Sequence, residues 1–273
     1  MPELPEVETV KETLKKQVLN RVIKNVIIRY DKIITGISLD KFKEKIKNQK
    51  INDIKRRGKW LLFELDDYFL VSHLRMEGKY FINKQDDEIT KHQHVIFDLD
   101  DNIQLRYSDV RKFGKMYLIK KEEINLVPPV SELGHEPFDE KLTIEYLKDK
   151  YKNKSMPIKT SLLDQSIIVG IGNIYADEIL FLSKINPYKK CNELNDLELQ
   201  AIINNTKTVL TKAIKLGGST IRSYTSSDGS HGRFQNELLV HTKTICPICK
   251  TIIKKDKING RGTYYCINCQ KEN

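Results

Sequence analysis

The chain begins with Met1-Pro2-Glu3-Leu4-Pro5-Glu6-Val7-Glu8, a stretch that combines two prolines with three carboxylates. Removal of Met1 would leave Pro2 as a secondary amine. A free α-amino group titrates near roughly 8 and a lysine near roughly 10.4, so far more of such an amine is unprotonated and nucleophilic at neutral pH. Proline also suits the first turn of a helix, and Pro2 taken alone favours that simpler interpretation.

The residues that follow predict an amphipathic helix. Apolar side chains recur at spacings of three and four, as Val7, Val10, Leu14 and Val18, and the pattern ends near Asn20. Glu3 and Glu6 then lie near a helix N-terminus, where the dipole favours anions, and near the amine, for which they could shuttle protons. With these features the first eight residues resemble the N-terminus of the formamidopyrimidine-DNA glycosylases, bacterial enzymes that excise oxidised purines.

The length and net charge of the chain limit the classes of function that it can have. The 273 residues suffice for two domains, and 39% of them are hydrophobic. Lys plus Arg number 47 against 37 Asp plus Glu, and the formal charge of +10 favours a polyanionic partner, nucleic acid first, over a merely basic protein. No apolar run approaches the roughly 18 residues of a membrane span, and the charged opening leaves no room for a secretory signal. We therefore expect a soluble, cytoplasmic protein without a membrane partner.

Residues 22 to about 120 predict short strands separated by polar turns. The candidates are 22–30, 51–57, 60–65, 68–74, 94–99, 103–107 and 115–119. Hairpin turns are expected at Asp66-Asp67 and at Asp100-Asp101-Asn102, and one short helix at residues 39–46 interrupts the strands. An antiparallel β-sandwich or barrel follows, with the N-terminal helix packed against it.

A domain boundary is expected near residue 130, where Pro128-Pro129 and the stretch 134–137 break the strand pattern. Helical periodicity follows at 140–152, 173–183 and 195–215, and Gly217-Gly218 ends the last helix. Residues 217–237 form a long polar loop, mobile or functional. The expected class is α+β multidomain, with an N-terminal domain at 1–130, a helical domain at 131–237 and a C-terminal domain at 238–273.

The C-terminal domain carries the most specific local motif. Cys246, Cys249, Cys266 and Cys269 form two CxxC pairs separated by 16 residues, the spacing of a four-thiolate zinc ribbon. So short a segment cannot bury a sufficient core, whereas zinc can supply on the order of 10 kcal/mol of coupled folding free energy. Four sulfur ligands leave no open position, so we expect one structural Zn²⁺. Disulfides are the less favoured alternative in a cytoplasmic protein.

Between the two pairs, Asn259-Gly260-Arg261-Gly262-Thr263 predicts a turn with Arg261 at a hairpin tip. A basic hairpin suits duplex DNA, with the arginine on a phosphate, and a solvated arginine in a protein-binding ribbon is the alternative. The resemblance favours the first, because Arg261 matches the arginine of the family's zinc ribbon.

A second motif is Gly170-Ile171-Gly172-Asn173, in which two glycines and an N-capping asparagine open a helix. The exposed amides of a helix N-terminus are a natural seat for a phosphate, although a plain helical turn is the commoner meaning. The motif matches the family's helix-two-turns-helix element, which implies that Asn173 binds a phosphate. Lys159 matches a family lysine near the damaged nucleotide and is otherwise a surface lysine.

Five residues of the first domain have ordinary explanations singly, as core residues, surface charges or a satisfied sheet histidine. They are Lys59, His73, Met76, Arg111 and Phe113. Three of them follow strands in turns, where burial is least expected. An enzyme that acts on a base must flip it from the duplex, and apolar wedges recover part of that cost. The resemblance implies that Met76 and Phe113 fill the gap, that Arg111 bonds the orphaned cytosine, and that the other two contact phosphate or nucleotide.

Four residues have no assigned role. His92 and His94 lie two apart on a predicted strand, but nothing supplies further metal ligands, so we interpret them as structural. His241 occupies a position where the family often has tyrosine, and Cys191 is a lone thiol.

The resemblance runs from Pro2 to Gln270 and implies a monomeric base-excision-repair enzyme acting on duplex DNA with oxidised purines, in a cleft between the domains. Pro2 would attack the sugar C1′, Glu3 would protonate the ring oxygen, and β,δ-elimination would cut the strand. Catalytic roles follow for Pro2, Glu3, Lys59 and Arg261, and a DNA contact for Glu6. Lesion choice is assigned to the loop with Ser219, Arg222, Ser223 and Tyr224.

Two alternatives stay open. A sister family, the endonuclease VIII-like glycosylases for oxidised pyrimidines, shares the amine, Glu3, the helical motif and the ribbon. Leu4 and the Met76, Arg111, Phe113 set favour the purine enzyme. A non-catalytic zinc-ribbon protein that binds damaged DNA is the alternative from another class.

Overall fold

The structure, a computed structural model, describes residues 1–219 and 232–271. Its described residues fall into two compact units. The first comprises residues 1–2 and 6–131, and the second comprises 3–5, 132–219 and 232–271. The chain thus passes from one unit to the other after Ser131, and residues 3–5 belong to the second unit although Leu4 and Pro5 begin the first helix.

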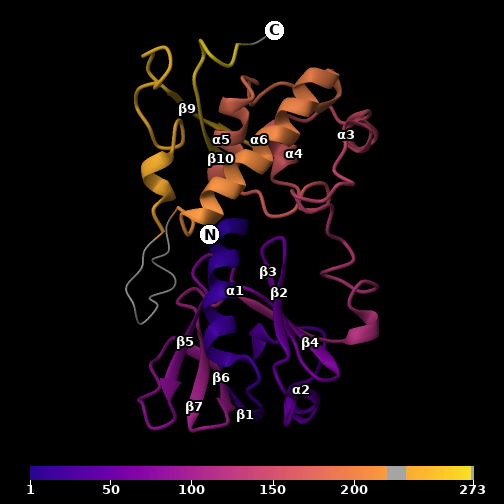
Figure 1. Ribbon diagram of the computed structural model, residues 1–273, viewed down its shortest axis with the longest axis vertical. Helices are drawn as coiled ribbons and strands as arrows, with labels where there is room; N and C mark the ends of the chain where they lie inside the picture. The colour runs from indigo at the N-terminus through magenta and orange to yellow at the C-terminus, as the bar shows by residue number, and fades with distance from the viewer. Residues whose placement is uncertain (220–231, 272–273) are drawn as a thin grey trace. The chain divides into compact units, whose positions relative to one another are not determined.

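The first unit contains helix α1 (Leu4–Val18), helix α2 (Leu39–Ile46) and two four-stranded antiparallel sheets (Figure 1). One sheet has the order β1-β6-β7-β5, and its strands are Ile23–Ile28, Gln93–Leu99, Ile103–Ser108 and Lys79–Lys84. The other has the order β2-β3-β4-β8, with strands Asp53–Arg57, Trp60–Glu64, Tyr68–His73 and Lys115–Lys120. Two antiparallel sheets with a leading helix confirm the predicted α+β class.

The apolar stripe of α1 is buried as predicted. Val7, Val10, Leu14 and Val18 are at most 2% exposed and belong to one hydrophobic core with Phe63 of β3 and Phe97 of β6. A fully buried side chain of this kind contributes roughly 1.5–3 kcal/mol, so the helix is held firmly on the sheets. The helix ends before Asn20, whose positive φ of 64° terminates it.

Strand β5 was not predicted. Its sequence, Lys79-Tyr80-Phe81-Ile82-Asn83-Lys84, does not alternate cleanly, and of its side chains only Tyr80 is buried. Pairing with β7 fixes the strand instead, so tertiary context overrode the local pattern. The turn between β6 and β7 matches the prediction, because Asp101 and Asn102 both have the positive φ that a tight hairpin requires.

The second unit is helical with a small hairpin. Its elements are α3 (Ile144–Tyr151), α4 (Ile158–Leu162), α5 (Asn173–Leu182), α6 (Asp196–Lys215), β9 (Lys254–Ile258) and β10 (Arg261–Tyr265). Short 3-10 turns lie at Asp31–Ile33 and Lys121–Glu123 in the first unit and at Cys191–Glu193 and Phe234–Glu237 in the second. Helix α3 begins later than residue 140 because Thr143 caps it, and the five-residue α4 was too short to be predicted from periodicity.

Helices α5 and α6 form the centre of the second unit. Seven of the ten residues of α5 are buried, including two acids, whereas α6 buries one face and begins with a capping box between Asn195 and Glu198. Within the described ranges, 1–219 and 232–271, no helix has the length and apolarity to cross a membrane.

Candidate functional site

The N-terminus opens onto a cavity of the first unit. Pro2 and Glu6 are buried and line this cavity of about 760 Å³ together with Met76, His92 and Val110. Met76 follows β4, in the region where a turn was predicted, and its side chain is 40% exposed. The cavity thus combines the N-terminal residue pair, a carboxylate and an exposed apolar side chain within one unit.

Glu3 has a structural task that the sequence did not reveal. Its carboxylate accepts hydrogen bonds from the backbone N–H groups of Gly172 at 2.6 Å and Ile174 at 3.0 Å, and a longer one from Tyr175 at 3.5 Å. The side chain is 3% exposed. The acid therefore caps the N-terminus of α5, where free N–H groups and the helix dipole both favour an anion.

This cap corrects two expectations about the Gly170–Asn173 motif. Asn173 was predicted to cap the helix, but it is the first helical residue; Gly172 is the N-cap and supplies no side chain. The amides predicted to seat a phosphate carry the Glu3 carboxylate instead. A Cβ on Gly172 would lie 2.3 Å from the Glu3 Cδ, so glycine is needed there to admit the acid.

The side chain of Asn173 stays a candidate ligand. Its Oδ1 is buried and has no hydrogen-bond partner among the described residues. A buried amide oxygen without a partner is costly, which marks the start of α5 as a place where a ligand or water would complete the bonding.

Asp109 builds the loop that presents Arg111 and Phe113. Its Oδ1 accepts from the Arg111 N–H at 3.0 Å, and its Oδ2 accepts from the N–H groups of Phe113 and Gly114, both at 2.8 Å. Phe113 is 48% exposed, and the Arg111 guanidinium lies 4.6 Å from the centre of its ring. The predicted wedge and its neighbouring arginine therefore lie together at the surface, on a loop whose backbone is hydrogen-bonded to Asp109.

His73 and Lys59 lie at the ends of neighbouring strands of the second sheet. The imidazole Nδ1 accepts from the Arg75 N–H at 2.9 Å, so the proton of the neutral ring is on Nε2, which makes that nitrogen a donor. Burial, with the charges of Arg75 and Lys59, lowers the pKa of His73 to about 3. The rings of His73 and Trp60 meet edge-on, with their centroids 4.6 Å apart. Lys59, in the turn before β3, is only 5% exposed.

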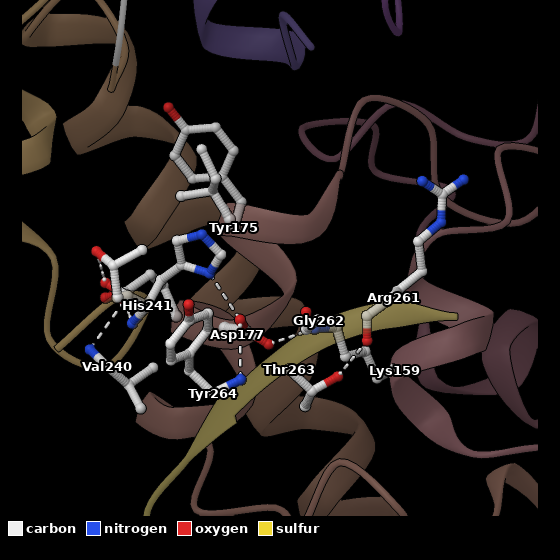
Figure 2. Close-up of polar contacts among 12 residues, drawn as sticks. Lys159, Tyr175, Asp177, Val240, His241, Arg261, Gly262, Thr263 and Tyr264 are labelled. Carbon is white, nitrogen blue, oxygen red and sulfur yellow. Dashed lines mark hydrogen bonds and ion pairs between the residues drawn. The ribbon is translucent and has the colours of Figure 1, made fainter. Parts of the chain in front are cut away.

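Lys159 is not the surface lysine that was the alternative. It is fully buried, and its ammonium donates to Asp177 Oδ1 at 2.6 Å and to the Gly262 carbonyl at 2.7 Å (Figure 2). Burial lowers the pKa of Lys159, although the Asp177 carboxylate opposes that shift. The side chain links α4 to the next helix, α5, and to β10, whose Gly262 lies 103 residues further along the chain.

His241 is attached to the same acid. Its Nδ1 lies 2.7 Å from Asp177 Oδ2, and its ring meets the Tyr264 ring edge-on at 4.9 Å. The backbone N–H groups of Leu239, Val240 and His241 all donate to the Glu178 carboxylate at 2.8–3.0 Å. Burial raises the pKa of Glu178 against these hydrogen bonds. Two consecutive acids of α5 thus fix the segment that leads into the zinc ribbon.

The hairpin of the ribbon differs slightly from the expected one. Asn259 and Gly260, both with positive φ, form the two-residue turn, and Arg261 is the first residue of β10, paired with Ile258. The arginine is exposed and extends from the strand away from Asp177 in Figure 2. It therefore lies beside the predicted tip, where it can reach a ligand.

The four predicted zinc ligands meet at one point. All four Sγ atoms lie within 4.8 Å of one another; Cys246 and Cys269 are 3.8 Å apart and Cys249 and Cys266 3.4 Å. A tetrahedral site with Zn–S bonds of about 2.3 Å has S–S edges of about 3.8 Å, whereas a disulfide is about 2.05 Å long. The donor set therefore fits a single structural Zn²⁺, and the disulfide alternative fails.

Of the predicted lesion-recognition residues, Ser219 is buried, and Arg222, Ser223 and Tyr224 lie outside the described residues. His94 is structural as predicted, because its Nε2 bonds the Asp109 carbonyl at 2.9 Å. His92 precedes β6 and lines the Pro2 cavity instead.

Sequence reasoning missed Asp109 and Asp177. A signal for Asp109 exists, because aspartate before a turn commonly accepts hydrogen bonds from the following amides. Asp177 lies next to Glu178 in a helix that is otherwise almost wholly apolar, and charged residues in such a helix need buried partners. The identity of those partners depends on the tertiary fold and could not be predicted.

Three protein-family models match successive parts of the chain. The model described as "Formamidopyrimidine-DNA glycosylase N-terminal domain" matches residues 1–116, "Formamidopyrimidine-DNA glycosylase H2TH domain" matches 133–225, and "Zinc finger found in FPG and IleRS" matches 246–271. Together they cover most of the sequence and follow the order of the two units and the ribbon.

Whole-length relatives and solved structures agree. The formamidopyrimidine-DNA glycosylase of Listeria monocytogenes is 44% identical over 273 residues, covering 99% of this chain and 100% of the relative. That of Bacillus cereus is 48% identical over 274 residues and covers 99% of both. A Lactococcus lactis FPG mutant in complex with Fapy-dG-containing DNA superposes with a TM-score of 0.93 at 39% identity, covering 99% of this chain and 100% of the other. The Lactococcus lactis Fpg bound to abasic-site DNA gives 0.91 at 40% identity, with the same coverage.

Proposed function

The chain belongs to the formamidopyrimidine-DNA glycosylase family, and from that premise we propose that it is a base-excision-repair enzyme with both glycosylase and AP-lyase activity. Its substrate is duplex DNA that contains oxidised purines, namely 8-oxoguanine and formamidopyrimidines. The enzyme acts as a monomer in the cytoplasm, where it has access to bacterial chromosomal DNA. The observation that carries the proposal is the cavity in which Pro2 lies beside Glu6 and Met76.

The reaction follows from the chemistry of the N-terminus after Met1 is removed. The Pro2 nitrogen bonds to C1′ as the bond from C1′ to the base breaks, and the base departs with that electron pair and is protonated by water. Glu3, the next residue in the chain, takes the proton of the attacking amine and passes it to the ring oxygen. The sugar then opens to an iminium at C1′. Loss of a C2′ proton expels the 3′ phosphate by β-elimination, loss of the C4′ proton expels the 5′ phosphate by δ-elimination, and water hydrolyses the remaining C=N bond to free Pro2.

Binding combines phosphate contacts with replacement of the flipped base. Lys59, His73, Asn173 and Arg261 supply cationic or polar groups for the backbone, in line with the chain's net positive charge. Met76 and Phe113 are exposed apolar side chains suited to fill the vacated stack, and Arg111 stands beside Phe113 to bond the unpaired base. Glu6 contacts the flipped nucleotide in the Pro2 cavity. The loop with Ser219, Arg222, Ser223 and Tyr224 is assigned to the choice of lesion.

Zinc has a structural role in this scheme. The four cysteines hold the metal with no open position, so its contribution is to fold the ribbon that carries Arg261.

The test of substrate class compares excision of 8-oxoguanine opposite cytosine with excision of an oxidised thymine in an otherwise identical duplex. The proposal expects a clear preference for the purine. A preference for the thymine lesion would place the chain with the oxidised-pyrimidine enzymes. Binding of both duplexes without strand cleavage would instead identify a damage-binding protein.

A further inference from the structure

We propose that Lys159 is a positioning residue that holds strand β10, and with it Arg261, in place, and that it makes no contact with DNA. This inference rests on the proposed function only in assigning Arg261 to a phosphate. It departs from the role that family resemblance implied for Lys159, a contact near the damaged nucleotide.

The ammonium group of Lys159 is buried. Lys159 and Asp177 have no exposed side-chain surface, and the 2.6 Å pair between them lies beneath the hairpin. The second hydrogen bond of the ammonium goes to the carbonyl of Gly262, the residue after Arg261. A phosphate could reach this ammonium only if the contact with β10 were broken.

Lys159 and Asp177 together hold β10 at two points. The lysine binds the carbonyl of Gly262, and Asp177 Oδ2 accepts from the N–H of Tyr264 at 3.2 Å (Figure 2). A third anchor lies at the turn, where Asn259 Nδ2 donates to Thr160 Oγ1 at 2.9 Å. The side chains of two consecutive residues of α4 therefore bind the hairpin that carries Arg261.

The β9–β10 hairpin has little stability by itself. Strands β9 and β10 form a two-stranded sheet of five residue pairs, and an isolated hairpin of this size is marginally stable in water. The position of the hairpin on α4 and α5 must therefore be fixed by contacts outside the two-stranded sheet. His241 extends the same network, because Asp177 also binds its Nδ1. The acid thus couples the hairpin to the segment that enters the ribbon.

The test is a double-mutant cycle between Lys159→Met and Arg261→Ala, read as the Kd of the zinc-loaded enzyme for a duplex with a tetrahydrofuran abasic analogue. Arg261→Ala should weaken binding by about tenfold, the loss of one charge-assisted hydrogen bond. Lys159→Met should weaken it several-fold, and the double variant should bind no worse than Arg261→Ala alone. Lys152→Met, which removes an equal charge from an exposed site, should stay within about twofold of the parent.

The salt dependence separates a positioning role for Lys159 from a direct contact between its ammonium and a phosphate. In the Arg261→Ala background, Lys159→Met should leave the slope of log Kd against log salt unchanged. Additive losses in the cycle, with a slope that falls by about one for the lysine, would overturn the proposal because they indicate a direct phosphate contact. If Lys159→Met does not fold because Asp177 loses its ammonium partner, Lys159→Met/Asp177→Asn removes both charges and enters the cycle in its place.

The two levels of inference fail differently. If Arg261→Ala changes neither the Kd nor the salt slope, the assignment of Arg261 under the proposed function is wrong, whatever Lys159 does. If Arg261→Ala behaves as expected and the cycle is additive, the positioning role alone is wrong.

Discussion

The carboxylate of Glu3 accepts a 2.6 Å hydrogen bond from the backbone N–H of Gly172, 169 residues later in the chain, so the beginning of the chain caps helix α5. The acid next to the proposed nucleophile is therefore held by backbone groups and not by a mobile side chain. Gly170 makes the neighbouring contact, because its carbonyl accepts from the Leu4 N–H at 3.0 Å. The spacing of the two glycines reflects the packing of residues 3 and 4 against this turn.

Gly172→Ala should disable base excision. The added Cβ would lie 2.3 Å from Glu3 Cδ, so the acid must leave its position, and we expect a stability loss of about 1–3 kcal/mol together with a loss of excision of at least about tenfold. Thermal unfolding and single-turnover excision of 8-oxoguanine measure the two effects. Gly262→Ala is the control for stability, since a Cβ there meets nothing within 4 Å. Full activity in Gly172→Ala would mean that the position of Glu3 is unimportant.

Asp109→Ala should release the loop that carries Phe113. Three backbone N–H groups lose their acceptor. One N–H group that stays buried without a partner lowers the stability of the fold by about 1–3 kcal/mol. We expect weaker binding of abasic-site DNA and a lower unfolding temperature. Phe113→Ala should weaken binding without the loss of stability, because that side chain is half exposed. If Asp109→Ala binds DNA like the parent, the loop does not need its aspartate scaffold.

Stability should fall in acid partly through His73. Its pKa is about 3 in the folded protein against about 6.5 in an unfolded chain, so the unfolded state binds the proton more tightly. The contribution is present in full above about pH 6.5 and is lost as the pH falls from there towards 3. His73→Asn keeps an acceptor for the Arg75 N–H and cannot be protonated. Urea unfolding between pH 4 and 7 should show a shallower pH dependence in that variant; equal slopes would contradict the assignment.

Removal of zinc should unfold the ribbon and spare the first unit. The metal ties Cys246 and Cys249 to Cys266 and Cys269, and the segment buries few apolar side chains of its own, among them Val240, Ile253, Ile258 and Tyr265. A strong chelator should release one zinc per chain, measured with a colorimetric dye, and should abolish tight DNA binding. The amides of β6 and β7 should keep their protection from hydrogen exchange. Retained binding in the zinc-free protein would show that the ribbon does not contribute.

Local patterns predicted a large part of the architecture. The stripe of α1, most strands of the sheets, the hairpin turn at Asp101 and the cysteine spacing each follow from short-range rules, and the structure contains all of them. Strand β5 was missed because its formation depends on pairing with β7. Helix α4 was missed because five residues are too few to show a helical periodicity. Their formation depends on partners that are distant in the sequence.

The sequence predicted which residues belong to the candidate site better than it predicted the contacts those residues make. Pro2, Glu6 and Met76 line one cavity, and the cysteines meet as expected. The capping role of Glu3 and the burial of Lys159 could not be predicted, since each depends on a partner that lies at least 18 residues away in the chain. The sequence does not identify the partner that folding brings to a charged residue.

The most direct measurement of the central claim is borohydride trapping on a duplex that contains 8-oxoguanine, followed by mass mapping of the crosslinked peptide. The account predicts an adduct at the nitrogen of an N-terminal Pro2, formed only by protein that has lost Met1. A crosslink through a lysine such as Lys59, or equal incision by protein that retains Met1, would contradict it.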